Sequence, residues 1–219
     1  MDLGQYHNIV QEVCMIYEMA LVARPEATDE QMASLKDMIA EIAGQYEGEV
    51  LLTDDWGRKQ FAQVAKNGAS HGHYVYFIIK GNNKLNDEIN RRTKISDDVH
   101  KILLVKLSDI DAEAEEIVKK YKTPHSKAHN GSQTDELEKG GDKDRRRFSK
   151  RKNCWFKSNS ISADWKDPKT FNWLVNEFGK IQPSRVSGIS RKHHRYVESA
   201  IKRARNIGLA SHLSGNLTE

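Results

Sequence analysis

Apolar residues form short runs in the first half of the chain, with two amphipathic stretches between them. Runs rich in β-branched and aromatic side chains predict strands at residues 17–24, 49–55, 74–80 and 101–107, with a weaker strand at 61–65. Helical spacing of apolar residues predicts one helix from Met32 to Tyr46 and another around Leu85 and Ile89. The order β-α-β-β-α-β predicts a ferredoxin-like domain, in which both helices cover one face of an antiparallel sheet.

Local signals mark the ends of these helices. Thr28 and Gln31 have the spacing of a capping box, and Gly48 ends the first helix. Asn82 or Asn83 caps the second helix. Both helices therefore have a defined start in the sequence, independent of their apolar pattern.

The strand at 74–80 is apolar on both of its faces, and Trp56-Gly57 predicts a turn or bend ahead of it. Alternation puts Val75, Phe77 and Ile79 on one face and Tyr74, Tyr76 and Ile78 on the other. One set should cover the helices, and the other should be free to receive a second module. Stacking of these aromatic rings on RNA bases is an alternative to the core and interface role that we favour.

The last third of the chain predicts a small helical domain. Asp167 and Pro168 form a helix start, and Gly179 ends that helix. Its apolar side consists of Phe171, Leu174, Val175 and Phe178. Pro183 and Gly188 frame a turn.

A final helix is predicted from about residue 191 to 209, with Ser190 as its cap. One side is apolar and holds Val197, Ala200, Ile201, Ala204 and Ile207. The other side is basic. Such a helix is suited to contact phosphates with its basic face while its apolar face packs on the domain.

Charge is divided unevenly along the chain. Residues 1–110 contain 12 Lys and Arg against 17 Asp and Glu, whereas residues 145–219 contain 17 against 5. A segment this basic favours a polyanionic partner, most simply nucleic acid. We therefore predict an α+β protein with an extension at 1–14, a ferredoxin-like domain at 15–110, an acidic and polar linker at 111–144 and a basic helical domain at 145–219. Residues 111–121 predict a brief charged helix, and residues 122–144 a flexible segment.

The candidate RNA-binding residues are the cations of a basic arm, of the turn and of the last helix. They are Arg145, Arg146, Arg147, Lys150, Arg151, Lys152, Arg185, Arg191, Lys192, Arg195, Lys202, Arg203 and Arg205. Weaker candidates, in the ferredoxin-like domain, are Arg58, Lys59, Arg91 and Arg92.

Other kinds of site have little support in the sequence. The two cysteines, Cys14 and Cys154, are isolated, and neither the His71/His73 pair nor His193-His194 has zinc-ligand spacing. We predict no metal, no cofactor, no catalytic constellation and no disulfide. Cys154 is either a small packing residue, which we favour, or a reactive thiol near cations. No run approaches the roughly 18–20 apolar residues that a membrane helix needs, and residues 1–14 resemble no targeting segment.

The first half resembles bacterial small-subunit ribosomal protein six. The resemblance rests on YEMALVARPEAT, DDWGRKQFAQVAK, HYVYFIIKG and VHKILLVKL, and it covers nearly all of residues 15–110. The most specific piece is the corner at residues 55–59. Residues 1–14 depart from the family, which usually starts close to Met15.

The last third resembles bacterial small-subunit ribosomal protein eighteen. The strongest elements are residues 179–181, 183–188 and 200–205, and the arm with Lys152-Asn153-Cys154 fits the front of that family. The polar C-terminus from Ala210 onward departs from it.

Together the two resemblances imply a non-catalytic protein of the small ribosomal subunit. In bacteria the two families are neighbours in the platform region, and the second is the main RNA binder of the pair. The expected partners are ribosomal RNA, neighbouring ribosomal proteins and, inside the chain, the two modules with each other. The expected location is a cytoplasmic ribosome or a bacterial-type organelle ribosome. The alternative is a non-ribosomal regulatory nucleic-acid-binding protein, and an enzyme ranks third.

Overall fold

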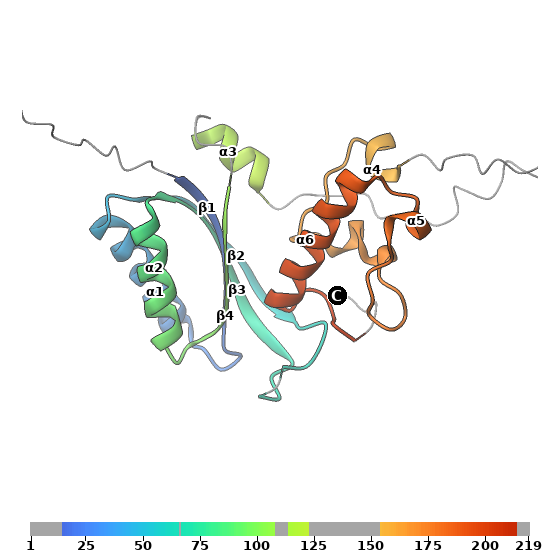
Figure 1. Cartoon of the computed structure of the whole chain (residues 1–219). Coiled ribbons are helices and arrows are strands. Elements are labelled where there is room, and N and C mark those ends of the chain that lie inside the picture. The colour runs from blue at the N-terminus through green and yellow to red at the C-terminus, as the bar shows by residue number, and fades with distance from the viewer. Residues whose placement is uncertain (1–14, 66, 108–113, 123–153, 214–219) are drawn as a thin grey trace, which may run out of the picture. The chain divides into compact units, whose positions relative to one another are not determined.

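The computed structural model describes residues 15–65, 67–107, 114–122 and 154–213 (Figure 1). These residues form two compact units. One is made of residues up to 57 together with 73–120, and the other of residues 58–72 together with those from 121 onward. The expected extension 1–14, most of the linker and the arm 145–152 lie outside the described residues.

The first unit contains a four-stranded sheet with the order β2-β3-β1-β4. The strands are β1 (Met15–Ala23), β2 (Glu49–Gln60), β3 (His71–Gly81) and β4 (Val99–Lys106). The central strand β1 runs antiparallel to both neighbours, with Met19 opposite Phe77 and Leu104. This topology is the ferredoxin-like arrangement and confirms the predicted fold class.

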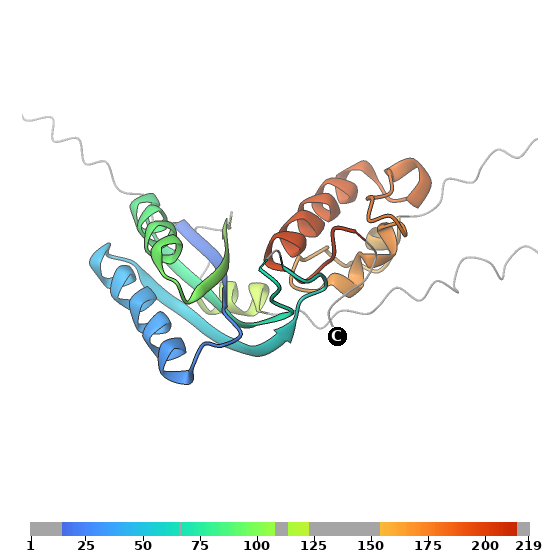
Figure 2. The ribbon, with the colours of Figure 1, turned by 90° about the horizontal axis from the view of Figure 1, so that it is seen from below.

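Two helices cover one face of this sheet, as both views show (Figure 1, Figure 2). They are α1 (Asp29–Gln45) and α2 (Asn83–Ile95). The predicted capping box is present: Thr28 accepts a hydrogen bond from the Gln31 backbone, and the Gln31 side chain accepts one from the Thr28 backbone at 2.8 Å. Asn82, rather than Asn83, caps α2 and accepts from Leu85 N at 2.9 Å.

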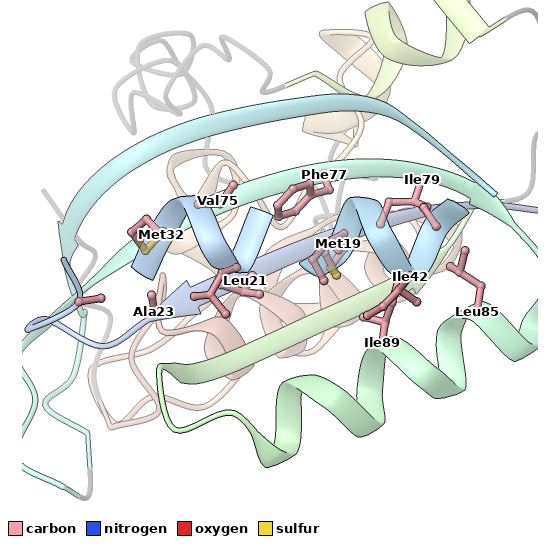
Figure 3. Packing of buried hydrophobic residues seen from close by; sticks show 14 residues of the cluster. Met19, Leu21, Ala23, Met32, Ile42, Val75, Phe77, Ile79, Leu85 and Ile89 are labelled. Atoms are coloured by element: carbon pink, nitrogen blue, oxygen red, sulfur yellow. The ribbon is translucent and has the colours of Figure 1, made fainter. Parts of the chain in front are cut away.

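The core of this unit lies between the sheet and the two helices (Figure 3). Val75, Phe77 and Ile79 of β3 are part of this core, so their face of the strand packs against the helices. On the other face Trp56 stacks on Tyr74 and Tyr76, with ring centroids 6.4 and 5.3 Å apart. The docking of a second module that we expected on this face stays a prediction.

The expected turn at Trp56-Gly57 and the expected strand at 61–65 are both wrong. Strand β2 continues to Gln60 because Gly57 adopts a φ of +71° within it. Residues 61–65 begin the loop to β3, where Ala65 N donates to Ala69 O at 2.9 Å. Ala62 N donates to Gly208 O at 3.0 Å, so its backbone is paired with the C-terminal segment rather than with a strand.

The described part of the linker contains one helix, α3 (Ala114–Tyr121), where a brief charged helix was expected. The second unit then contains α4 (Trp155–Ser158), the 3-10 turns η2 (Pro168–Thr170) and η3 (Asn172–Leu174), α5 (Ser184–Ser187) and α6 (Arg191–Ile207). The C-terminal region is therefore helical, as predicted.

The predicted helix from Pro168 to Phe178 is replaced by the two 3-10 turns. Its start is correct, since the Asp167 side chain accepts from Lys169 N. Phe171 then leaves helical geometry at φ −126°, and Val175 pairs with Ile181 in an isolated β-bridge. The buried Phe171 and Leu174 are three residues apart, a spacing that fits a 3-10 turn as well as an α-helix. Phe178, which was expected on the apolar side of this helix, is 77% exposed.

The last helix agrees with its prediction. Ser190 caps α6 and accepts from His193 N, and Gly208 ends the helix in a left-handed conformation at φ +90°. The five predicted apolar residues are all buried. The buried face of α6 therefore fixes which of its side chains point outward.

Candidate nucleic-acid interface

The outward face of α6 carries four of the described candidate cations. Arg191, Lys192, Arg195 and Lys202 are exposed along it, and Arg203 is half-buried at its side. Because the opposite face is buried in the unit, these charges have a fixed orientation. The helix thus presents a row of cations to solvent, which is the arrangement that phosphate contact requires.

The first two turns of α6 border a hollow of about 390 Å³. Its lining residues in the described part of the chain are Arg191, Lys192, Arg195 and Tyr196. Three of the four are cations that the sequence identified, and the fourth is an aromatic side chain that it did not. The basic pattern predicted a charged surface here, and the structure adds that this surface is concave.

Lys202 has an acidic neighbour one turn away. Its Nζ lies 2.5 Å from Glu198 Oε1, and this hydrogen bond lowers the pKa of Glu198. The Lys202 side chain is 65% exposed and the Glu198 side chain 41%. An exposed pair of this kind contributes little free energy, about 0–1 kcal/mol, so Lys202 can exchange Glu198 for a phosphate.

Arg205 has a different role from the other cations of α6. Its guanidinium donates to the backbone carbonyls of Gly179 and Ser211, the latter at 3.0 Å. Burial of this group lowers the pKa of Arg205. Two of its donors are therefore used inside the unit, and its contribution to RNA binding would come through the position of the loop and the C-terminal segment.

The other candidates are distributed over the chain. Arg185 is exposed on α5, and Arg58 is exposed near the end of β2. Lys59 is half-buried beside it. Arg145, Arg146, Arg147, Lys150, Arg151 and Lys152 lie outside the described residues.

Arg91 and Arg92 form ion pairs on α2. Both guanidinium groups bind Glu88, at 2.7 and 2.8 Å. Their hydrogen bonds, first from Arg91 and then from Arg92, lower the pKa of Glu88 to about 2. These two candidates belong to the first unit, whereas the α6 cations belong to the second.

Cys154 has one described histidine, His193, within hydrogen-bonding distance. In the described ranges no group of three or more His, Cys, Asp or Glu residues could hold a metal ion. The Cys154 thiol lies 3.5 Å from His193 Nδ1, and the His193 ring stacks on Phe156. Burial alone would raise the pKa of Cys154, but backbone hydrogen bonds from Ser190 and Lys157 lower it. His73 instead binds Asp55, at 2.6 Å.

None of the described helices has the length and apolarity that would let it cross a bilayer.

The sequence signal that we missed is Tyr196, an aromatic residue between Arg195 and the buried Val197. A search for aromatics interleaved with exposed cations, rather than for cations alone, would have found it.

The N-terminal part of the chain matches the family model for ribosomal protein S6 at residues 16–106. The solved structure of 30S ribosomal protein S6 from Thermotoga maritima aligns with a TM-score of 0.41 and 15% identity, over 49% of this chain and 94% of that chain.

The C-terminal part matches the family model for ribosomal protein S18 at residues 159–210. The small ribosomal subunit protein bS18 of Geotalea uraniireducens is 47% identical over 70 residues, which are 32% of this chain and 77% of that protein. The bS18 of Syntrophobacter fumaroxidans is 48% identical over 69 residues, which are 31% of this chain and 85% of that protein.

Both resemblances that the sequence suggested are confirmed, and they occur in one chain. Through its C-terminal part the chain belongs to the ribosomal protein S18 family, and it carries a ribosomal protein S6 domain ahead of it, which makes it a fused structural constituent of the small ribosomal subunit that binds ribosomal RNA.

Proposed function

We propose that this chain lies in the platform region of the small subunit, where it holds ribosomal RNA through the basic arm and α6. The observation that carries the proposal is the exposed cationic face of α6, with Arg191, Lys192 and Arg195 around one hollow. The arm at residues 145–152 adds six cations directly ahead of the helical unit in the sequence. The role is structural and involves no catalysis.

Binding of this kind rests mainly on phosphates and RNA shape. Each cation that neutralises a phosphate releases a condensed counterion, so the affinity falls steeply as salt rises. Side chains do not reach bases in the deep major groove of A-form RNA. The cations of a rigid helix therefore contribute to binding by matching the positions of phosphates, more than by recognising the base sequence.

We also propose that the two modules dock on each other within the chain. The opposite charges of residues 1–110 and 145–219 support this, because complementary potentials favour association. Twenty residues of flexible chain have an r.m.s. span of about 25 Å, which gives tethered partners a high effective concentration. Neighbouring small-subunit proteins are further partners, and the location is the ribosome of a cytoplasm or of an organelle with bacterial-type ribosomes.

Co-sedimentation with small subunits tests the ribosomal role. The full chain should travel with the subunit peak in moderate salt. The double variant Arg191→Gln/Arg195→Gln should be depleted from that peak, whereas the matched control Lys94→Gln/Lys119→Gln, on α2 and α3, should remain. Absence of the unmodified chain from the peak would contradict the proposal. Preference for duplex DNA over ribosomal RNA would favour the regulatory alternative.

The docking is tested by cutting the linker. A protease site placed within residues 123–144 allows the full chain to fold before it is cleaved. If the modules bind each other, the two fragments should elute together in gel filtration at low salt and separate at high salt. Separate elution at every salt concentration would contradict the docking without affecting the ribosomal role.

A further inference from the structure

Tyr196 is an exception on the outward face of α6. Its side chain is 54% exposed, while the other large hydrophobic residues of the helix are buried. Within the described chain it has neither a hydrogen-bond partner nor a ring contact. The ring is therefore a free aromatic surface, presented to solvent from a helix whose opposite face is fixed by packing.

The position of Tyr196 relative to the cations is set by the helix. Residues four apart are neighbours on a helical surface, so Lys192 and Tyr196 form one row and Arg191 and Arg195 form the next. These four residues line the hollow of about 390 Å³. Pockets that hold small molecules start at about 300 Å³, so a hollow of this size can take a single nucleobase.

We infer that the hollow receives an unpaired RNA base that stacks on the Tyr196 ring, with the phosphates beside it held by Arg191, Lys192 and Arg195. This inference rests on the proposed function and adds the class of RNA that the site takes. In a paired A-form helix the base faces are stacked within the duplex, so only an unpaired nucleotide has a face to offer. Stacking on an aromatic side chain is tolerant of base identity, because every base has a π-face.

The combination of groups favours RNA over a protein partner. An acidic peptide would pair with the three cations but would leave the tyrosine ring without a defined role. A nucleotide uses both kinds of group at once, since it joins an anionic phosphate to a flat aromatic base within one residue. The site thus has one attachment point for each part of a single nucleotide.

The test compares Tyr196→Leu with Tyr196→Phe in the full chain. Leucine keeps a smaller apolar side chain but removes the π-face, whereas phenylalanine keeps the ring. Tyr196→Leu should bind a single-stranded RNA oligonucleotide at least roughly fivefold more weakly, and Tyr196→Phe should bind like the unmodified chain. Thermal melting of all three proteins shows whether the substitutions disturb the fold.

Three further measurements test the stacking contact and distinguish it from charge. The slope of log affinity against log salt should be unchanged by Tyr196→Leu, because no phosphate contact is lost, but it should be shallower for Arg195→Gln. Duplex RNA of the same sequence should bind both tyrosine variants equally. Ultraviolet cross-linking of the chain to ribosomal RNA should give a cross-linked peptide that contains Tyr196.

The outcomes are distinct from those of the proposed function. If the unmodified chain binds RNA and joins small subunits while Tyr196→Leu binds single-stranded RNA equally well, the base site is overturned and the ribosomal role stands. If Tyr196→Leu binds RNA normally but is poorly incorporated into subunits, Tyr196 contacts a protein partner rather than an RNA base. Failure of the unmodified chain to bind RNA would overturn both.

Discussion

The guanidinium of Arg205 donates a hydrogen bond to the backbone carbonyl of Gly179, and through this contact α6 holds the loop that precedes α5. The same side chain binds the carbonyl of Ser211 from its Nε. Gly179 itself adopts a φ of +73°. A cation of the basic stretch 200–205 is thus a structural link between three segments of the second unit.

Replacement of Arg205 should therefore reduce stability more than replacement of its neighbours on α6. Arg205→Gln leaves two carbonyls without their charged donor, and an unsatisfied buried group costs about 1–3 kcal/mol. Arg195→Gln is the matched control, because Arg195 is exposed on the same helix and its loss should change the free energy of unfolding by less than about 0.5 kcal/mol. Urea denaturation measures both. Equal loss of stability in the two variants would show that the Arg205 bonds contribute nothing specific.

A side chain at position 179 should also be costly. A Cβ built on Gly179 would overlap the carbonyl oxygen of His212, and its left-handed φ disfavours any L side chain. Gly179→Ala should lower the free energy of unfolding by about 1–3 kcal/mol.

The control for this change is Gly44→Ala on α1. A Cβ at position 44 meets nothing within 4 Å, and alanine is the better helix former by about 1 kcal/mol. One glycine-to-alanine change should thus destabilise and the other should be neutral or stabilising. Thermal melts of the two variants decide this, and a neutral Gly179→Ala would refute the close packing of residues 179 and 212.

Of the four helices that the sequence predicts from an apolar period and a cap, three are present. Helices α1 and α6 have the predicted caps Thr28 and Ser190, and α2 has Asn82, one of the two caps that the sequence offered. The buried face of α6 also follows directly from its period, and this face determines where the cations point. Most of the candidate interface was therefore predictable, apart from its concave shape.

The features that the sequence patterns did not predict depend on contacts outside the element concerned. The stretch after Pro168 has an apolar spacing that two kinds of helix share, and the bridge from Val175 to Ile181 decides between them. Residues 61–65 have strand-like composition, but Ala62 N is paired with Gly208 O. Arg205 counts as a surface cation in any helical projection, because nothing in the helix itself reveals the carbonyl of Gly179.

The ionised carboxylate of Asp55 should make stability depend on pH in the acid range. Partial burial alone would raise the pKa of Asp55, but hydrogen bonds from Lys36, from Gly57 N and from His73 lower it to about 2. Because this folded pKa lies below the ordinary value of 3.8, the group stabilises the fold above that value. The stabilisation is lost as pH falls from about 4 towards 2.

Chemical denaturation between pH 5 and pH 2 measures this effect. Asp55→Asn should be less stable than the unmodified chain at pH 5, and the difference should shrink as the pH approaches 2. Asp37→Asn is the control, since Asp37 is exposed on α1. A stability difference that stayed constant over this range would mean that the charge of Asp55 is not what stabilises the unit.

Two helix caps offer a way to separate the order of α6 from overall stability. Ser190→Ala and Thr28→Ala each remove a side chain that caps a 17-residue helix, at a cost of about 1 kcal/mol. Only Ser190 caps the end of the helix that carries Arg191, Lys192 and Arg195. Fraying of that end disperses the cations, so Ser190→Ala should weaken binding to ribosomal RNA whereas Thr28→Ala should not. Urea denaturation and RNA titration of both variants give the comparison. Equal RNA affinity in the two variants would indicate that the cations bind phosphates without needing an ordered start of α6.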